Sequence, residues 1–263
     1  DYDVDGTTGA SLLYLSLTDL NAKVDFYIPD REKEGYGLSS CGIDHAKSKG
    51  ADLLITCDCG INAFDPVADA NQKGIDVIIT DHHTPDKTLP NAIAILNPKQ
   101  KDCEYPFKGL CGCGVAFKLI SALSEACGSE LNVGLKYLDL VALATAADMV
   151  PIMGENRVLV HHGLETIEKG ENHGVRQLLK ETGLIGESLN VGKLVFGLAP
   201  KINAAGRMGD ANRTVELLTT SKKQKAEELA SILVRENKRR QLIQEEVVND
   251  AIRMVHAHVD LER

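Results

Sequence analysis

Apolar residues in the first part of the chain come in short runs, separated by segments long enough for a helix. The runs cover residues 24–28, 52–57, 76–80 and 92–96, and the helix-length segments lie near 42–49 and 63–73. Each run is too short for a helix of ordinary length and is apolar on both faces. Strands of this kind that alternate with helices predict an α/β fold, with a parallel sheet covered by helices on both faces.

A helical period governs the remainder of the chain. Residues 6–22 carry apolar side chains at Ala10, Leu13, Leu17 and Leu20, the spacing of one helix face. After Pro98 the apolar residues recur at about 3.6 positions, which predicts helices over residues 112–127, 132–150, 155–169 and 174–183. We therefore expect the sheet part to end near residue 98 and a helical part to follow over residues 99–220.

The last predicted helix is unusually long. No Gly or Pro interrupts residues 221–256, and two apolar stripes, one beginning at Ala226 and one at Ile243, flank the polar stretch 235–241. A helix with this pattern is expected to be buried at both ends and solvated in the middle. We interpret residues 221–263 as a linker from a domain at 1–220 toward a second domain missing from this chain. The chain also begins in acids without the strand that should precede them, so we expect a fragment.

Composition narrows the class of protein. The apolar content of 43% is that of a globular chain, and no stretch reaches the roughly 20 apolar residues of a membrane span. The seven cysteines are odd in number and lie beside predicted strands and turns, which favours reduced thiols in the cytoplasm. The two Cys-x-Cys pairs, at 57/59 and 111/113, have a spacing that is unusual for structural zinc.

Acidic residues and histidines cluster where the predicted strands end. The four clusters are Asp1-Tyr-Asp3-Val-Asp5, Asp58, Asp81-His82-His83, and Asp148 near the end of a predicted helix. Each alone has an ordinary interpretation as a turn or surface residue, and the first is no EF-hand loop because its twelfth position is Leu12. Together they form an oxygen and nitrogen donor set without thiolates, which suits Mn²⁺ or Mg²⁺.

Two divalent cations in such a site would change how the net charge of −9 is interpreted. Phosphate contacts usually come from Lys and Arg, so an acidic chain is unexpected for a nucleic-acid enzyme. Two ions would offset about four negative charges and turn the acids into ligands. A pair of ions about 3.5–4 Å apart is also the arrangement used for displacement at phosphorus. The sequence therefore predicts a two-metal phosphodiester hydrolase.

The same clusters carry a resemblance to a known family. The stretches "DYDVDGTTG", "CDCG", "TDHH" and "ALATAADMVP" resemble the four motifs of the DHH phosphoesterases. The stretches "YPFKGLCGCGVAFKL" and "LAPKINAAGRMGDANRTVELLTT" are similar to the RecJ branch of that family, the single-strand-specific exonucleases. The resemblance covers nearly the whole chain, and one departure is Lys201, where the branch commonly has Arg.

The resemblance implies a role for each matching residue. Asp3 and Asp5 would bind the two ions separately, Asp58 would bridge both, and His82 and Asp148 would complete one coordination sphere. Asp1 would be an additional ligand or an orienting acid. His83 would contact the phosphate and stabilise the leaving group, and Arg207 would bind phosphate with its two-pronged guanidinium. The run 109–115 is interpreted either as a turn into the next helix or as backbone amides near phosphate.

The activity implied is hydrolysis of single-stranded DNA from its 5′ end, releasing 5′-mononucleotides in DNA repair and recombination. Manganese is the expected cation, with magnesium as the alternative. A helicase and a single-strand-binding protein are expected partners, the chain is expected to be monomeric, and without a second domain it should hydrolyse poorly. Two alternatives stay open: a nanoRNase or cyclic-dinucleotide phosphodiesterase of the same family, and a repair scaffold that has lost catalysis.

Overall fold

A small parallel sheet forms one end of the molecule. The computed structural model describes residues 1–129 and 132–258. The strands β1 (Leu53–Cys57), β2 (Asp76–Thr80) and β3 (Ala94–Leu96) pair in the order β1-β2-β3, and all pairs are parallel. Leu53 lies opposite Asp76, and Ile78 lies opposite Ala94. The prediction of a parallel sheet is confirmed, with β2 at its predicted bounds.

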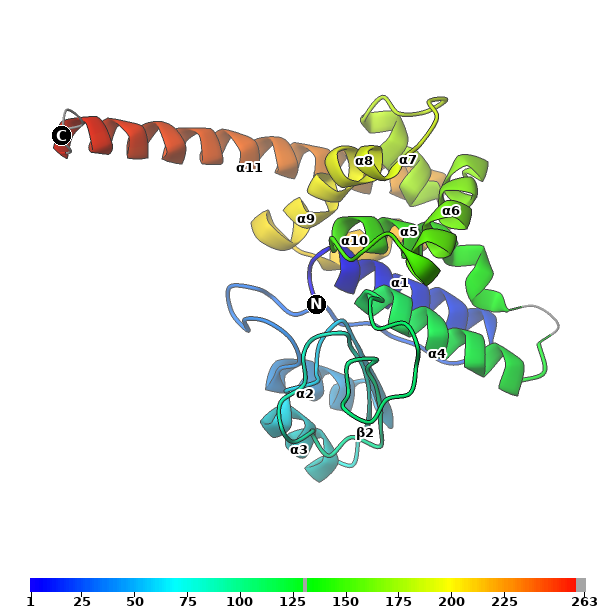
Figure 1. Cartoon of the computed structure of the whole chain (residues 1–263). Coiled ribbons are helices and arrows are strands. Elements are labelled where there is room, and N and C mark those ends of the chain that lie inside the picture. Colours follow the sequence, from blue (N-terminus) through cyan, green and yellow to red (C-terminus); the bar gives the residue numbers. More distant parts are fainter. Residues whose placement is uncertain (130–131, 259–263) are drawn as a thin grey trace.

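Helices cover both faces of this sheet, as predicted (Figure 1). On one face lie α2 (Ser40–Ser48) and α3 (Phe64–Gln72), and a small apolar cluster that includes Ile43, Val67 and Ile79 fills the space beneath them. On the other face α1 (Val4–Asp19) and α4 (Gly112–Ala126) pack against β1. This second face belongs to the main core of the molecule, which continues into the helical part.

The helical part is built around α5 (Leu138–Ala147), whose side chains are nearly all buried because its sequence is almost entirely Leu, Val and Ala. Helix α6 (Gly154–Lys169) packs along α5, and a short helix at Val133–Tyr137 leads into α5. The helices α7 (His173–Glu181), α9 (Ala199–Met208) and α10 (Asn212–Thr219) pack against the last helix of the chain, and short helices at Val191–Lys193 and Leu194–Leu198 lead into α9. The sequence pattern predicts neither α9 nor α10. Pro200 and Gly206 interrupt the apolar period of α9, and α10 is only 8 residues long.

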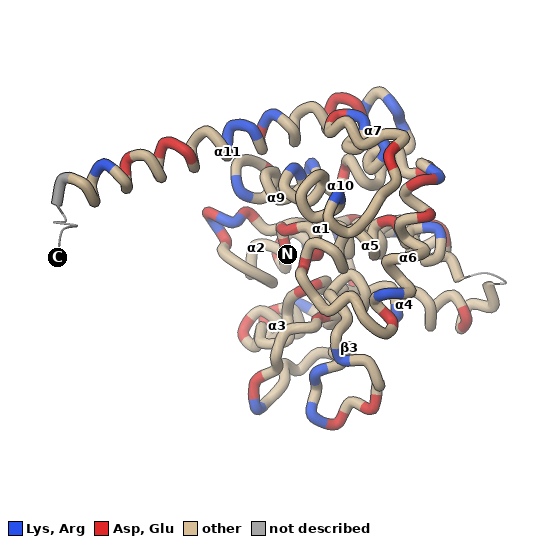
Figure 2. Tube along the Cα trace, turned by 45° about the horizontal axis from the view of Figure 1, so that its top comes forward, with Lys and Arg blue, Asp and Glu red and all other residues tan. Residues whose placement is uncertain are grey.

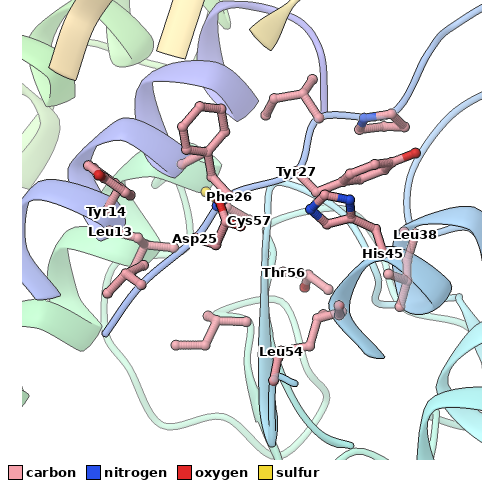
Figure 3. Close-up of a pocket in the computed structure, with 18 of the residues that line it drawn as sticks. Leu13, Tyr14, Asp25, Phe26, Tyr27, Leu38, His45, Leu54, Thr56 and Cys57 are labelled. Atoms are coloured by element: carbon pink, nitrogen blue, oxygen red, sulfur yellow. The ribbon is translucent and has the colours of Figure 1, made fainter. Parts of the chain in front are cut away.

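Residues 24–28 form no strand, so that prediction is wrong. The segment runs extended from the end of α1 past the sheet, but no ladder joins it to β1. A strand requires a neighbour at ladder distance. A cavity lies between this segment and β1 instead (Figure 3).

The last helix, α11 (Lys223–His258), is 36 residues long and projects from the body of the molecule (Figures 1 and 2). Its first stripe is buried as predicted, with Ala226, Leu229 and Leu233 at most 8% exposed. The second stripe is not buried, because Ile243 is 41% and Val247 is 62% exposed. The prediction of a helix buried at both ends is therefore wrong for this chain. Among the described residues, no helix has the length and apolar content of a membrane span.

Asp139 gives the fold a testable pH dependence. Its carboxyl lies buried in the first turn of α5, and burial raises its pKa to about 7. In the unfolded chain this pKa is about 3.9, so between these values the folded state holds a proton that the unfolded state has lost. The free energy of unfolding therefore falls as the pH rises from about 4 to about 7, and levels off above that.

The substitution Asp139→Asn should remove the loss of stability that ionisation of this buried carboxyl causes. We expect the variant to exceed the wild type in free energy of unfolding by on the order of 3 kcal/mol at pH 8, and to match it near pH 4. Urea unfolding across this range measures the difference, and Asp102→Asn, at an exposed acid, is the matched control. A difference that stays constant with pH would show that Asp139 does not titrate as described.

Candidate metal centre

The predicted acids and histidines meet at the carboxyl edge of the sheet. Asp58 follows β1 directly, and Asp81, His82 and His83 follow β2. Parallel strands end at the same edge, so these residues become neighbours. The N-terminus of α1 brings Asp3 and Asp5 to the same edge, and the C-terminus of α5 brings Asp148. One site thus collects residues from all four clusters.

His82 lies at the centre of one group of donors. Its Nε2 atom is 3.1 Å from Oδ1 of Asp58, 3.7 Å from Oδ2 of Asp5 and 3.7 Å from Oδ2 of Asp148. The Nε2 atom, Oδ1 of Asp58 and Oδ2 of Asp148 are all buried and form no hydrogen bond. Buried polar atoms without a partner are costly, and their convergence on one point is what a bound cation would resolve. The donor set fits a divalent metal.

A second group of donors shares Asp58 with the first. Carboxylate oxygens of Asp1, Asp3 and Asp58 lie within 4.8 Å of one another. Asp3 also caps α1 by accepting a hydrogen bond from the amide of Gly6 at 3.0 Å. Since Asp58 belongs to both groups, the arrangement is compatible with two cations bridged by this one carboxylate.

Asp5 is fixed by the first turn of α4. Its carboxylate accepts hydrogen bonds from the backbone amides of Gly112 at 2.6 Å and Cys113 at 2.7 Å. The N-terminus of a helix favours a negative charge through exposed amides and the helix dipole. The run 109–115 therefore forms a turn into a helix, and two of its amides bind Asp5 itself.

The carboxylates repel one another in the absence of a cation. Burial, followed by the charge of Asp3, raises the pKa of Asp58 to about 8. Burial likewise raises the pKa values of Asp5 and Asp148, with help from neighbouring acids. Asp58 also has a left-handed backbone, with a φ of 60°, and Met149 beside Asp148 has a φ of 58°. Such conformations in non-glycine residues concentrate at functional sites.

Asp81 orients the two histidines and is not one of the converging donors. Its Oδ1 accepts hydrogen bonds from the backbone amide of His82 at 2.7 Å and contacts Nδ1 of His83 at 2.7 Å, while its Oδ2 accepts one from the amide of Ile61 at 2.9 Å. The bond to Asp81 raises the pKa of His83, so the imidazolium is favoured. The other ring nitrogen, Nε2, is 3.4 Å from the hydroxyl of Tyr36. No sequence pattern indicates Tyr36, which lies in a loop outside the four motifs.

Asp81→Asn should separate metal binding from hydrolysis. The side-chain amide of the variant carries no negative charge, so it stabilises the imidazolium of His83 less than the carboxylate does. We therefore expect hydrolysis to fall by roughly 100-fold or more while manganese affinity changes little. The alkaline limb of the pH–rate profile should move to lower pH, because the pKa of His83 falls and the imidazolium is lost at a lower pH. Titration of Mn²⁺ together with rates from pH 5 to 9 would measure both effects. Equal losses of binding and rate would instead show that Asp81 holds the metal site itself.

Arg207 lies in α9, which packs against the first motif. The amide of Val4 donates to Oδ1 of Asn203 at 3.1 Å, and Gly206 approaches Tyr2 so closely that a Cβ there would be 2.4 Å from the carbonyl oxygen of Tyr2. Arg207 follows on an exposed position, and no ion pair among the described residues includes it. Arg207 thus has an exposed side chain and directly follows a residue that touches the first motif.

Comparison with known proteins assigns the class. The profile described as "DHH family, N-terminal domain" matches residues 1–145. The chain therefore belongs to the DHH family.

Individual proteins of the family match nearly the whole chain. The chain is 45% identical over 256 residues to the single-stranded-DNA-specific exonuclease RecJ of Bacillus subtilis, which covers 97% of this chain and 32% of that protein. It is 38% identical over 263 residues to RecJ of Escherichia coli, covering 96% of this chain and 46% of that protein. The chain thus spans a third to a half of the length of these relatives.

Solved structures agree with this assignment. A crystal structure of exonuclease RecJ bound to manganese superposes with a TM-score of 0.86 at 37% identity, covering 95% of this chain and 63% of that one. RecJ of Thermus thermophilus in complex with Mn²⁺ gives a TM-score of 0.82 at 36% identity, covering 100% of this chain and 37% of that one. The predicted α/β fold and family are therefore confirmed.

Proposed function

We propose that the chain is the catalytic core of a RecJ-type exonuclease, which hydrolyses single-stranded DNA from the 5′ end and releases 5′-mononucleotides. The observation that carries this proposal is the convergence of partnerless buried atoms of Asp58, His82 and Asp148. The similarity to RecJ proteins supports the choice of substrate.

Divalent cations are the cofactor that this site would hold. Asp5, His82 and Asp148 would take one ion, Asp1 and Asp3 would take the other, and Asp58 would contact both. Manganese is our choice because carboxylate and imidazole donors suit it and because RecJ structures contain it, although RecJ of T. thermophilus is also known in complex with Mg²⁺. Such ions stabilise the charge that develops at phosphorus and activate the attacking water.

The residues around the metals would position the substrate. His83 is half exposed and carries a raised pKa, so its imidazolium would contact the phosphate and stabilise the leaving oxygen. Arg207 would bind a phosphate with two parallel hydrogen bonds. Beside them the rings of Tyr2 and Tyr36 lie 6.3 Å apart, and the guanidinium of Arg31 lies 5.4 Å from the ring of Tyr2. Aromatic and arginine surfaces of this kind stack with unpaired bases.

The wider setting is also proposed from the relatives. We place the protein in DNA repair and recombination in the cytoplasm, as a monomer that receives unwound strands from a helicase or a single-strand-binding protein. We also propose the division into a catalytic domain at 1–220 and a linker helix at 221–263.

The test is hydrolysis of a single-stranded oligonucleotide labelled at the 5′ end, with Mn²⁺ and with EDTA, using RecJ of B. subtilis as the positive control. Manganese-dependent release of labelled mononucleotide supports the proposal. Cleavage of dinucleotides while long strands resist would favour the nanoRNase alternative. If the folded chain binds manganese and hydrolyses neither substrate, the proposal of an active core fails and the scaffold alternative replaces it.

A further inference from the structure

Two successive residues at the N-terminal end of α6 bind the segment that leads into α4. Glu155 accepts a hydrogen bond from the hydroxyl of Tyr105 at 2.6 Å and forms an ion pair with Lys118 of α4. Asn156 donates a hydrogen bond from Nδ2 to the carbonyl oxygen of Gly109 at 2.7 Å. The N-terminal end of α6 is therefore attached both to α4 and to the loop before it.

Asn156 also binds the turn that follows α5. Its Nδ2 atom donates a second hydrogen bond, at 3.0 Å, to the carbonyl oxygen of Pro151. The residue is 0% exposed, and its Oδ1 atom is buried and forms no hydrogen bond with the described residues. An amide group has two N–H donors, and two carbonyl acceptors fix which way it points. Since a buried acceptor without a partner costs free energy, the two donated bonds are what this asparagine contributes to the structure.

The two carbonyls belong to segments that position two proposed metal ligands. Gly109 lies just before the first turn of α4, whose backbone amides bind the carboxylate of Asp5. Pro151 lies three residues after Asp148. Asp5 and Asp148 each have an Oδ2 atom 3.7 Å from Nε2 of His82. One buried side chain therefore connects the backbone supports of two donors in the same group.

The turn after α5 requires such a support because its backbone is strained. Met149 has a left-handed backbone with a φ of 58°, and its side chain is 87% exposed, so packing of that side chain does not hold the conformation. A non-glycine residue keeps this conformation only where its surroundings fix it. The bond from Asn156 fixes the backbone two residues further on, at Pro151. Without it, relaxation at Met149 would change the direction of the neighbouring Asp148.

We propose that Asn156 is a positioning residue of the metal centre, which holds the turn after Asp148 and the start of α4 at a fixed separation and thereby keeps Asp148 and Asp5 in place around one divalent cation. This inference rests on the metal centre of the proposed function. Asn156 acts through the backbone of the two segments and is no ligand itself. Loss of a group that orients a metal ligand in this way lowers metal affinity by about 10–100-fold. Asp1 and Asp3 belong to neither segment, so the ion that they would hold should not depend on Asn156.

Calorimetric titration of the whole chain with Mn²⁺ tests the proposal. In the variant Asn156→Leu the side chain keeps a similar volume but has no donor, so both carbonyls lose their partner. We expect the affinity for one Mn²⁺ to fall by at least roughly tenfold, while the affinity for the other changes by less than about twofold. The Mn²⁺ concentration for half-maximal hydrolysis of a labelled single strand should rise by the same factor, and excess Mn²⁺ should restore most of the rate.

Asn132→Leu is the matched control, because Asn132 supports the other half of α4. Its Nδ2 atom donates to Oγ of Ser121 at 2.7 Å, and its Oδ1 atom accepts from the amide of Gly134 at 3.0 Å. Both leucine variants should have a lower free energy of unfolding in EDTA, and only Asn156→Leu should lose affinity for Mn²⁺. If leucine at 156 prevents folding, Asn156→Ser, which can donate to one carbonyl, should show the same selective loss for one ion.

Two outcomes would overturn the role of Asn156. Lower stability with unchanged affinity for both ions would show that Asn156 supports only the fold. Equal losses of affinity for both ions would show that it does not act on the donors around His82 in particular. A wild type that binds Mn²⁺ without hydrolysing DNA would contradict the proposed function alone, since the two affinities still measure the role of Asn156. A wild type that binds no Mn²⁺ would overturn the metal centre and both proposals with it.

Discussion

Asp58→Ala is expected to lose manganese binding and hydrolysis together, with the rate falling by roughly 1000-fold or more. Asp58 belongs to both groups of donors, and its Oδ1 lies 3.1 Å from Nε2 of His82. Removing it takes one ligand from each proposed ion, whereas the loss of Asp1 or Asp148 would affect only one. Calorimetric titration with Mn²⁺ and hydrolysis of a labelled single strand would measure the two effects.

The control for this variant is Asp86→Ala, an exposed acid in the loop after β2. It should bind manganese and hydrolyse DNA as the wild type does. If Asp58→Ala retained full manganese stoichiometry, the bridging position of Asp58 would be wrong, even if activity were lost. Binding of one equivalent in place of two would show that a single ion depends on it.

Gly112→Ala is expected to have a similar effect without removing any ligand. A Cβ at this position would lie 2.5 Å from the Cβ and 2.8 Å from Oδ1 of Asp58. Helix α4 cannot easily shift away from Asp58, because the amides of Gly112 and Cys113 bind Asp5. Either Asp58 or Asp5 must move, so we expect hydrolysis to fall by on the order of 100-fold with weakened manganese binding.

Gly114→Ala is the matched control on the same helical turn. Its Cβ would come no closer than 3.4 Å to Leu110, a distance that a small shift accommodates. Both variants should keep the circular dichroism spectrum of the wild type, and only Gly112→Ala should lose activity. Full activity in Gly112→Ala would mean that α4 does not determine the position of Asp58.

The fold could be predicted where the physical signal is local. The strands β1, β2 and β3 appear as short runs that are apolar on both faces, and α4 and α6 appear through their period, because burial on known faces dictates these patterns. The predictions that proved wrong concern segments whose structure depends on partners far away in the sequence. Residues 24–28 have a strand sequence but pair with no described strand, and the second stripe of α11 is apolar although no described part of the chain covers it.

In the candidate site, too, some residues could be predicted from the sequence and others could not. Asp58, His82 and Asp148 could be identified because acids and histidines at strand and helix ends are distinctive in sequence. Asp81 stands in the same motif, yet only its hydrogen bonds show that it orients His83 and is not among the donors. The close approach of Gly112 and the contact of Tyr36 join segments far apart in the chain, and a single sequence holds no information on such distances.

Helix α11 has a mechanical consequence for any domain attached to its free end. At 1.5 Å per residue its 36 residues span about 54 Å, so a tilt of only about 5° at the base would displace the tip by about 5 Å. The N-terminal end of α11 packs against α9, the helix that carries Arg207. A force on the distal end of α11 would therefore reach the proposed phosphate ligand Arg207, and tension on a strand bound as we propose would be transmitted back along the helix.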